Sequence, residues 1–264
     1  MTKGFVSLMY HELERPRRAL CRSDAGYVRY VVEESEFRRQ LTRIRDLGLT
    51  GASVGEARRS DSERRVVAIT FDDGCASDLD VAAPILSEFG FSATFYITLD
   101  FLGRPGFLTP SSLRELSRLG FEIGCHGATH RYLTDLSEDD RDLEIRAAGI
   151  EISALAGAPV RHFSCPGGRW TPSSAEIARA AGYESFATSD PGTSAPTDFL
   201  IRRSPVMRQT SIEAFSDLAL FRRQGARRAK AAALGIAKSV IGNASYERFR
   251  NLLLRDSHDG GGES

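Results

Sequence analysis

The chain alternates short apolar runs with longer segments of helical periodicity, and this alternation limits its possible folds more than any other feature. The apolar runs have strand length and follow in the order FVSLMY, VVAITF, SATFYI, FEIGCH, VRHFSCP and YESFAT. Strand and helix alternate at least five times, which favours parallel strands joined by crossover helices. An open doubly wound sheet and a (β/α) barrel both satisfy this pattern. In both, functional residues gather where strands end.

Glycines mark the expected helix ends, because each follows an apolar-periodic run where a left-handed residue is favoured. They are Gly48, Gly90, Gly120, Gly157 and Gly182. Most connections are short, but the Gly/Pro-rich loops at 98–110 and 188–205 are long enough to shape a substrate groove.

The composition points to one main catalytic-size domain. The chain has 264 residues and 41% hydrophobic content, enough for a large single core. Its 35 basic and 35 acidic residues balance, so nothing predicts a nucleic-acid partner. The distribution is uneven, however, because residues 201–255 carry twelve Lys or Arg against three acids.

The C-terminal part differs from the rest of the chain. We expect a catalytic domain at 1–210, a basic amphipathic helical extension at 211–255 and a disordered tail at 256–264. The extension either packs on the main domain with a solvated basic face, or contacts an anionic membrane or a glycosyltransferase through residues 214–255. Without a signal peptide or an apolar stretch of roughly 18 residues, a cytoplasmic location is expected, with contact at the inner membrane face as an alternative.

Four cysteines are present without any CxxC spacing: Cys21, Cys75, Cys125 and Cys165. In a reducing compartment we expect them to be free, buried thiols. A Cys/His zinc site is the alternative interpretation.

The run VVAITF leads directly into Asp72, Asp73 and Gly74. Neighbouring residues of a strand point to opposite faces, but a turn at Gly74 can direct both carboxylates into one pocket. One carboxylate then binds a metal and the other acts as a base. The structural alternative is a pair of helix N-cap residues.

A second candidate group follows the run FEIGCH, where His126 and His130 are four residues apart. A helical turn would place both imidazoles on one side, a common arrangement for Zn²⁺. With a carboxylate from the first group, the two histidines would form a 2-His-1-carboxylate metal site. Of the remaining histidines, we expect His162 and His258 to be surface or structural residues.

Three motifs in this order and spacing resemble a known family: TFDDG at 70–74, HGATH at 126–130 and FSCPGGRW at 163–170. They resemble the motifs of the polysaccharide deacetylases, the carbohydrate esterase family 4 proteins with a NodB-homology domain. The resemblance covers roughly residues 5–205. It implies a distorted (β/α) barrel, with C-terminal helices appended here, and metal-dependent removal of N-acetyl groups from amino-sugars.

The resemblance also implies roles for individual residues. Asp73, His126 and His130 would bind the divalent metal, most simply Zn²⁺, with Co²⁺, Ni²⁺ or Mn²⁺ as alternatives. Asp72 would be the base that takes a proton from water activated by the metal. Substrate contacts are expected from the third motif, namely from Pro166, Gly167, Gly168, Arg169 and Trp170.

The sequence departs from the family pattern in three places. Ser164 stands where relatives carry the Arg that steadies the catalytic Asp, and Arg169 or Arg202 is a candidate replacement. Gly127 stands where Ser or Thr is usual. No His follows in the late strand that normally provides the general acid, because the chain has none between His162 and His258.

The missing acid draws attention to His11, which ends the first apolar run in the sequence LMYH. This opening resembles the branch of the family that acts on poly-N-acetylglucosamine, in which an N-terminal His takes the acid's place. His11 would lie on the same face as Asp72 and His126. By itself, a histidine there would more often be structural, but the resemblance implies that His11 is the acid.

The sequence thus predicts a metal-dependent N-deacetylase of an N-acetylated amino-sugar in a glycan or glycan precursor. Two alternatives stay open. The first is an amidohydrolase acting on a cyclic imide or ureide, and the second is a non-catalytic glycan-binding scaffold. Keeping a base beside a metal group argues against the scaffold, because a binding protein has no use for one.

Overall fold

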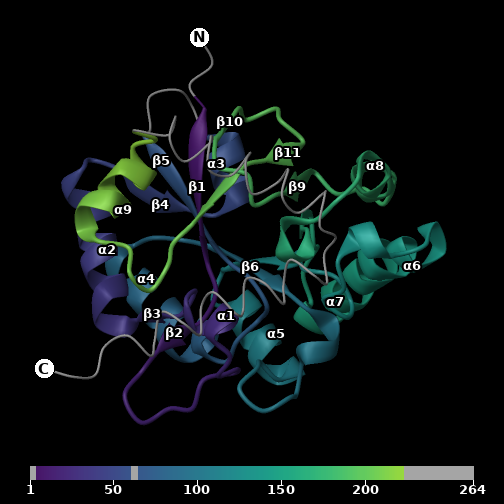
Figure 1. Ribbon diagram of the computed structural model, residues 1–264, viewed down its shortest axis with the longest axis horizontal. Helices are drawn as coiled ribbons and strands as arrows, with labels where there is room; N and C mark the ends of the chain where they lie inside the picture. Colours follow the sequence, from purple (N-terminus) through teal and green to yellow (C-terminus); the bar gives the residue numbers. More distant parts are fainter. Residues whose placement is uncertain (1–3, 61–64, 223–264) are drawn as a thin grey trace, which may run out of the picture.

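A computed structural model describes residues 4–60 and 65–222 of the chain. Its centre is a strongly curved sheet in which neighbouring strands are parallel, except for one antiparallel pair (Figure 1). The sheet consists of β1 (Phe5–Tyr10), β4 (Thr50–Ala52), β5 (Val66–Phe71), β6 (Thr94–Ile97), β7 (Glu122–Cys125), β8 (His162–Ser164), β9 (Ser185–Ala187), β10 (Thr193–Ser194), β11 (Leu200–Ile201) and β12 (Arg203–Pro205).

The sheet curls into a nearly closed barrel because its last strands return to the first. Strands β1, β5, β6, β7, β8 and β9 are hydrogen-bonded in that order, and β11 continues beyond β9. Strand β11 ends at Ile201, and β12 begins at Arg203 after one intervening residue. Strand β12 pairs in parallel with β1, and Arg203 lies opposite Ser7. Residues 200–205 therefore bridge the two edges of the sheet, and the predicted distorted (β/α) barrel is confirmed.

Helices cover the outside of the barrel, with α2, α4 and α9 on one side in Figure 1 and α6, α7 and α8 on the other. The helices are α1 (Ala25–Val28), α2 (Glu34–Asp46), α3 (Val54–Arg59), α4 (Ala83–Phe89), α5 (Pro110–Arg118), α6 (Glu138–Asp142), α7 (Ala148–Ala156), α8 (Pro172–Ala180) and α9 (Ile212–Ala219). The short helical turns are η1 (Asp78–Ala82), η2 (Leu99–Phe101), η3 (Leu133–Asp135), η4 (Leu143–Ala147) and η5 (Pro166–Gly168). A small separate sheet consists of β2 (Leu13–Glu14) and β3 (Val32–Glu33), which pair in parallel.

The predicted helix stops are confirmed. Gly90 and Gly157 adopt the left-handed conformation directly after α4 and α7, and the other three glycines also have positive φ. A residue with a Cβ would be strained there, so glycine at these points allows the chain to leave a helix and enter the next strand within a few residues.

Strand β5 shows how the barrel directs side chains. Val67, Ile69 and Phe71 belong to the large core between sheet and helices, and Phe71 stacks between Tyr10 and Phe95 at centroid distances of 5.2 and 5.0 Å. Because side chains alternate along a strand, Ala68, Thr70 and Asp72 point the other way, into the barrel. The sequence of β5 thereby places one carboxylate at the mouth of the barrel interior.

The first turns of the C-terminal extension pack on the barrel. Phe215 of α9 is fully buried, and Ser216 accepts a hydrogen bond from Nε of Arg43 on α2 at 2.8 Å. The rest of the predicted extension and the tail at 256–264 lie outside the described residues, so the contact assigned to 214–255 stays a prediction. Within the described part of the chain, no helix is long and apolar enough to span a membrane.

Candidate active site

A cavity of about 340 Å³ opens at the carboxyl ends of the barrel strands. Its wall includes every side chain that the sequence predicts for metal binding or proton transfer, namely His11, Asp72, Asp73, His126 and His130. These residues come from the ends of β1, β5 and β7 and from the loop after β7. Residues that are far apart in the chain, from His11 to His130, therefore face one space.

The two aspartates face the cavity because the backbone turns sharply between them. Asp72 continues the alternation of β5, and its N–H donates to the carbonyl of Tyr10 at 3.0 Å. Asp73 and Gly74 then adopt positive φ values of 82° and 83°. For a residue with a side chain this conformation costs about 1–3 kcal/mol, and such strain concentrates at functional sites. The turn that the sequence predicted at Gly74 therefore begins one residue earlier.

His126 and His130 reach the same point through an irregular loop. The predicted helical turn is wrong, because Gly127 and His130 have φ values of 88° and 64°. Even so, the two ring centroids lie 5.1 Å apart. The Nε2 atoms of His126 and His130 lie 3.6 and 3.2 Å from Oδ1 of Asp73.

This arrangement fits a divalent cation. Nδ1 of His126 lies 2.9 Å from the carbonyl oxygen of Ser164. A proton on Nδ1 satisfies that contact and leaves the Nε2 lone pair directed at Asp73. Within residues 4–60 and 65–222, the buried Oδ1 of Asp73 makes no hydrogen bond of good geometry, so it keeps its lone pairs for a ligand. Two imidazoles and one carboxylate are a donor set typical of Zn²⁺ and related divalent ions.

The charges around this group favour an ionised Asp73 and a neutral His126. Burial by itself raises the pKa of Asp73, but His130, His11 and His126 together outweigh burial and lower the pKa well below its usual range. Burial lowers the pKa of His126 to about 4. Burial also acts to lower the pKa of His130, but the carboxylate of Asp73 raises it above the usual value. Ionised carboxylates and neutral imidazoles are the forms that bind metals.

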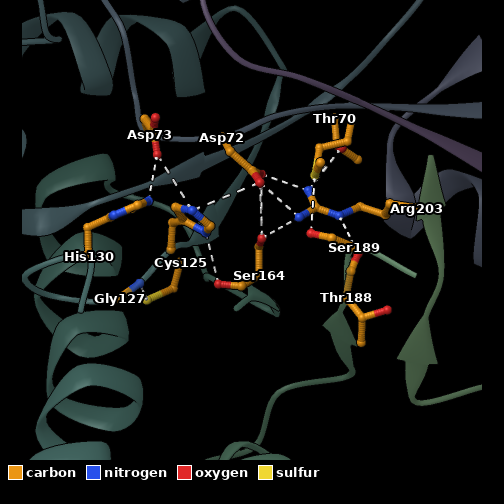
Figure 2. Close-up of polar contacts among 12 residues, drawn as sticks. Thr70, Asp72, Asp73, Cys125, Gly127, His130, Ser164, Thr188, Ser189 and Arg203 are labelled. Carbon is orange, nitrogen blue, oxygen red and sulfur yellow. Dashed lines mark hydrogen bonds and ion pairs between the residues drawn. The ribbon is translucent and has the colours of Figure 1, made fainter. Parts of the chain in front are cut away.

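Arg203, from the strand that closes the barrel, holds Asp72 in place (Figure 2). The guanidinium is fully buried and donates from its two terminal nitrogens to the two oxygens of Asp72, at 2.7 and 2.8 Å. Its other three N–H groups donate to Thr70 Oγ1 (3.1 Å), Thr188 O (3.1 Å) and Ser164 Oγ (2.7 Å). All five donors are thus used, and the fork geometry fixes the plane of the Asp72 carboxylate.

The ion pair also sets the protonation state of Asp72. Burial would raise the pKa of this carboxyl, but the charge of Arg203, helped by His126, brings the pKa below its ordinary value. Asp72 is therefore ionised at neutral pH although it is almost completely buried. Ser164 takes part in the same network, because its hydroxyl lies 3.4 Å from both oxygens of Asp72.

The replacements suggested by the sequence for the family's arginine were wrong. Arg202 is exposed, and Arg169 lies over the ring of Tyr132 at 4.1 Å. The residue that reaches Asp72 is Arg203. A small side chain at Ser164 leaves room for its guanidinium.

Replacing Arg203 with Gln is expected to destabilise the fold by about 3–5 kcal/mol, because the charge of Asp72 would be left buried without its partner. Thermal and denaturant unfolding measure this loss. In the folded fraction, kcat should fall while KM stays close to wild type, since Arg203 positions Asp72 and does not line the cavity. Arg202→Gln is the matched control and should change neither quantity. Equal effects at both positions would contradict the assignment.

His11 follows β1 and lines the cavity beside the aspartates. Its ring packs against Tyr30 with centroids 4.8 Å apart, and its buried Nδ1 has no hydrogen-bond partner among the described residues. Burial lowers the pKa of His11, although the charges of Asp73 and Asp72 partly oppose this. His11 is thus available for a polar ligand, as expected for a residue that acts on a substrate.

Only part of the third motif reaches the cavity. Gly167 and Arg169 line it, whereas Pro166, Gly168 and Trp170 are absent from its wall. The ring of Trp170 packs against Phe186 with centroids 5.6 Å apart. The cavity wall is completed by residues that the sequence did not single out, among them Arg22, Asp24, Tyr27, Tyr30 and Tyr132.

Glu144 of η4 is a supporting residue that the sequence analysis missed. Its carboxylate accepts hydrogen bonds from the N–H groups of Ala128 and Thr129 at 2.7 and 3.0 Å, and from the hydroxyl of Thr129. A Cβ at Gly127 would lie 2.8 Å from the same carboxylate. Glycine at 127 therefore allows Glu144 to hold the loop that carries His130, without the hydroxyl usual at 127.

His162 and the four cysteines are not members of the group formed by Asp73, His126 and His130. His162 is fully buried, with Nδ1 2.9 Å from Ser185 Oγ and Nε2 3.5 Å from Glu122, which confirms a structural residue. His258 is outside the described residues. All four cysteines are free thiols, and three are buried: Cys75, Cys125 and Cys165.

Comparison with known proteins agrees with this geometry. The family model described as polysaccharide deacetylase matches residues 59–186. The Bacillus subtilis protein YxkH is 26% identical over 191 residues, covering 70% of this chain and 64% of YxkH. A bifunctional xylanase/deacetylase of Pseudobutyrivibrio xylanivorans is 24% identical over 120 residues, covering 46% of this chain and 19% of that protein. The chain thus spans under two thirds of each relative.

Solved structures share the fold. The Streptococcus pyogenes deacetylase PplD, in complex with acetate, superposes with a TM-score of 0.72 at 21% identity, covering 83% of this chain and 99% of PplD. IcaB from Ammonifex degensii gives a TM-score of 0.68 at 24% identity, covering 82% of this chain and 97% of IcaB. The chain is thus similar to the polysaccharide deacetylase family in sequence over residues 59–186, and it shares the fold of solved deacetylase structures.

Proposed function

We propose that this protein is a metal-dependent hydrolase that removes N-acetyl groups from an amino-sugar in a glycan or glycan precursor. The observation that carries the proposal is the placement of two different carboxylates in one cavity. Asp73 faces two imidazoles within 3.6 Å, whereas Asp72, next to it in the chain, is held by Arg203. Asp73 is therefore placed to bind a cation, whereas Asp72 is placed to accept a proton.

When bound by Asp73, His126 and His130, a divalent cation polarises the acetamide carbonyl and makes water more acidic. Zn²⁺ fits the donor set, with Co²⁺, Ni²⁺ and Mn²⁺ as substitutes. Asp72 is ionised and oriented to take a proton from the attacking water. Arg203 keeps the carboxylate plane constant while this proton arrives.

His11 supplies the second proton transfer. An amine is a poor leaving group, so the tetrahedral intermediate would return to amide and water unless the nitrogen is protonated. His11 lines the same cavity as Asp72, and among the described residues no other histidine there is free of the metal group. Gly167 and Arg169 stand on the cavity wall where the sugar would lie.

The test begins with protein stripped of metal by a chelator. Adding Zn²⁺ should restore acetate release from an N-acetylglucosamine oligosaccharide, because Asp73, His126 and His130 then regain their ligand. His130→Ala should remain inactive at the same Zn²⁺ concentration. If none of Zn²⁺, Co²⁺, Ni²⁺ and Mn²⁺ produced acetate from any N-acetylhexosamine glycan, the proposal would be abandoned.

A further inference from the structure

A second group of metal-ligand side chains lies beside the active-site cavity and shares no residue with it. It consists of Glu12, Cys21 and Cys75, whose carboxylate and thiol atoms all lie within 4.8 Å of one another. Glu12 directly follows His11, and Cys75 directly follows the Asp72-Asp73-Gly74 turn. The group therefore joins the two segments that carry the proposed acid and the proposed base.

Hydrogen bonds already orient the members of this group. Both oxygens of Glu12 accept the N–H of Cys21, at 3.1 and 3.0 Å. The hydroxyl of Tyr27 donates to Glu12 Oε2 at 2.9 Å and lies 3.3 Å from Cys75 Sγ. The Sγ of Cys21 contacts the carbonyl oxygen of Gly106 at 2.9 Å. Such outer contacts hold ligands at a metal site in position before the ion arrives.

A buried carboxyl without a hydrogen-bond partner in the described part of the chain gives an independent indication of a cation site. Asp78, in η1, is fully buried, and neither of its oxygens has a hydrogen-bond partner within the described structure. Burial raises its pKa well above the ordinary value, and electrostatic interactions with Cys21, Asp73 and Glu12 add to this. A buried polar group with no partner is costly, and a nearby positive ion removes that cost.

We propose that Glu12, Cys21 and Cys75 bind a second divalent cation of the zinc type, with Asp78 as a nearby compensating carboxylate. Two thiolates and one carboxylate suit Zn²⁺ far better than Mg²⁺ or Ca²⁺. Binding releases the two thiol protons to solvent and forms two metal–sulfur bonds. Glu12 and Cys75 are buried, whereas Cys21 is partly exposed and provides the entry side.

The site would be structural. Cys21 precedes Arg22, which lines the active-site cavity together with Asp24 and Tyr27. A cation bound to Cys21 and Cys75 would fasten this loop to the turn that presents Asp72 and Asp73. It thereby fixes one wall of the cavity without taking part in the reaction.

Cobalt distinguishes the two sites, because only the Glu12/Cys21/Cys75 group contains sulfur. Reduced, metal-stripped protein loaded with Co²⁺ without air should bind two ions per chain and show a thiolate-to-cobalt charge-transfer band in the near ultraviolet. Cys21→Ser should bind one ion and lose the band. His130→Ala should also bind one ion but keep the band. Cys165→Ser, a buried cysteine outside both groups, should match wild type.

Each contrary result overturns the proposal. If the wild-type protein lacked the charge-transfer band, the second metal site would be disproved. The same would follow if the band were unchanged in Cys21→Ser. Thiol titration of the denatured, unreduced protein should find all four cysteines. A count of two, restored to four by reductant and replaced by a count of three in unreduced Cys21→Ser, would assign Cys21 to a disulfide and exclude the metal. If Cys21→Ser does not fold, Glu12→Gln replaces it and should bind the second cobalt ion at least tenfold more weakly.

Discussion

Asp72→Asn is expected to lower kcat by about 10²- to 10⁴-fold, the range for removing a positioned general base. Asparagine keeps the size of the side chain but has no charge with which to take a proton from water. Metal content should stay at the wild-type value, because Asp73, His126 and His130 are unchanged. Steady-state kinetics and elemental analysis of the same preparation measure both quantities.

Two controls test whether the loss of kcat is specific to the carboxylate of Asp72. Asp190→Asn, at an exposed carboxylate, should leave kcat unchanged. Glycan affinity of Asp72→Asn should remain close to wild type, which shows that only turnover is lost. A protein that binds glycan with full affinity but shows no turnover even as wild type would be a scaffold, and the catalytic account would fail.

His11→Ala is expected to lose most hydrolysis of the N-acetyl substrate, again by about 10²- to 10⁴-fold, while keeping its metal and its melting temperature. The loss follows from the poor leaving group, because an unprotonated amine is expelled slowly. A phenyl acetate ester with an acidic phenol needs no such proton. The same variant should therefore hydrolyse that ester at nearly the wild-type rate.

The pair of substrates separates a proton donor from a structural residue. If His11 only packed against Tyr30, the substitution would reduce both reactions equally through a displaced cavity wall. Asp72→Asn is the reference, because it should lose both reactions. Normal amide hydrolysis by His11→Ala would show that another group is the acid.

The sequence predicts much of this molecule because the relevant signals are local. The apolar runs predicted the parallel strands, and the glycines predicted the helix ends. Asp72, His11 and His126 stand at strand ends, and parallel strands bring such ends together at one face. No side-chain contact was needed to expect these residues in one cavity.

The rest depends on geometry that local patterns do not contain. Arg202 and Arg203 look alike in the sequence, and the one-residue break between β11 and β12 decides which of them enters the barrel. Glu144 lies 16 residues from Ala128, and its helix brings it under the loop. Similarly, the group of Glu12, Cys21 and Cys75 forms only where three separate loops meet.

The central claim is hydrolysis of an amide on a sugar, and its most direct test measures both products in one reaction. The zinc-loaded wild-type protein is incubated with an N-acetylglucosamine oligosaccharide, and acetate and free amine are quantified together. The account predicts equal amounts of the two, with neither formed by Asp72→Asn above background. Acetate without an equal amount of amine would show that the acetate does not come from the N-acetyl groups, and this result or the absence of both products would contradict the account.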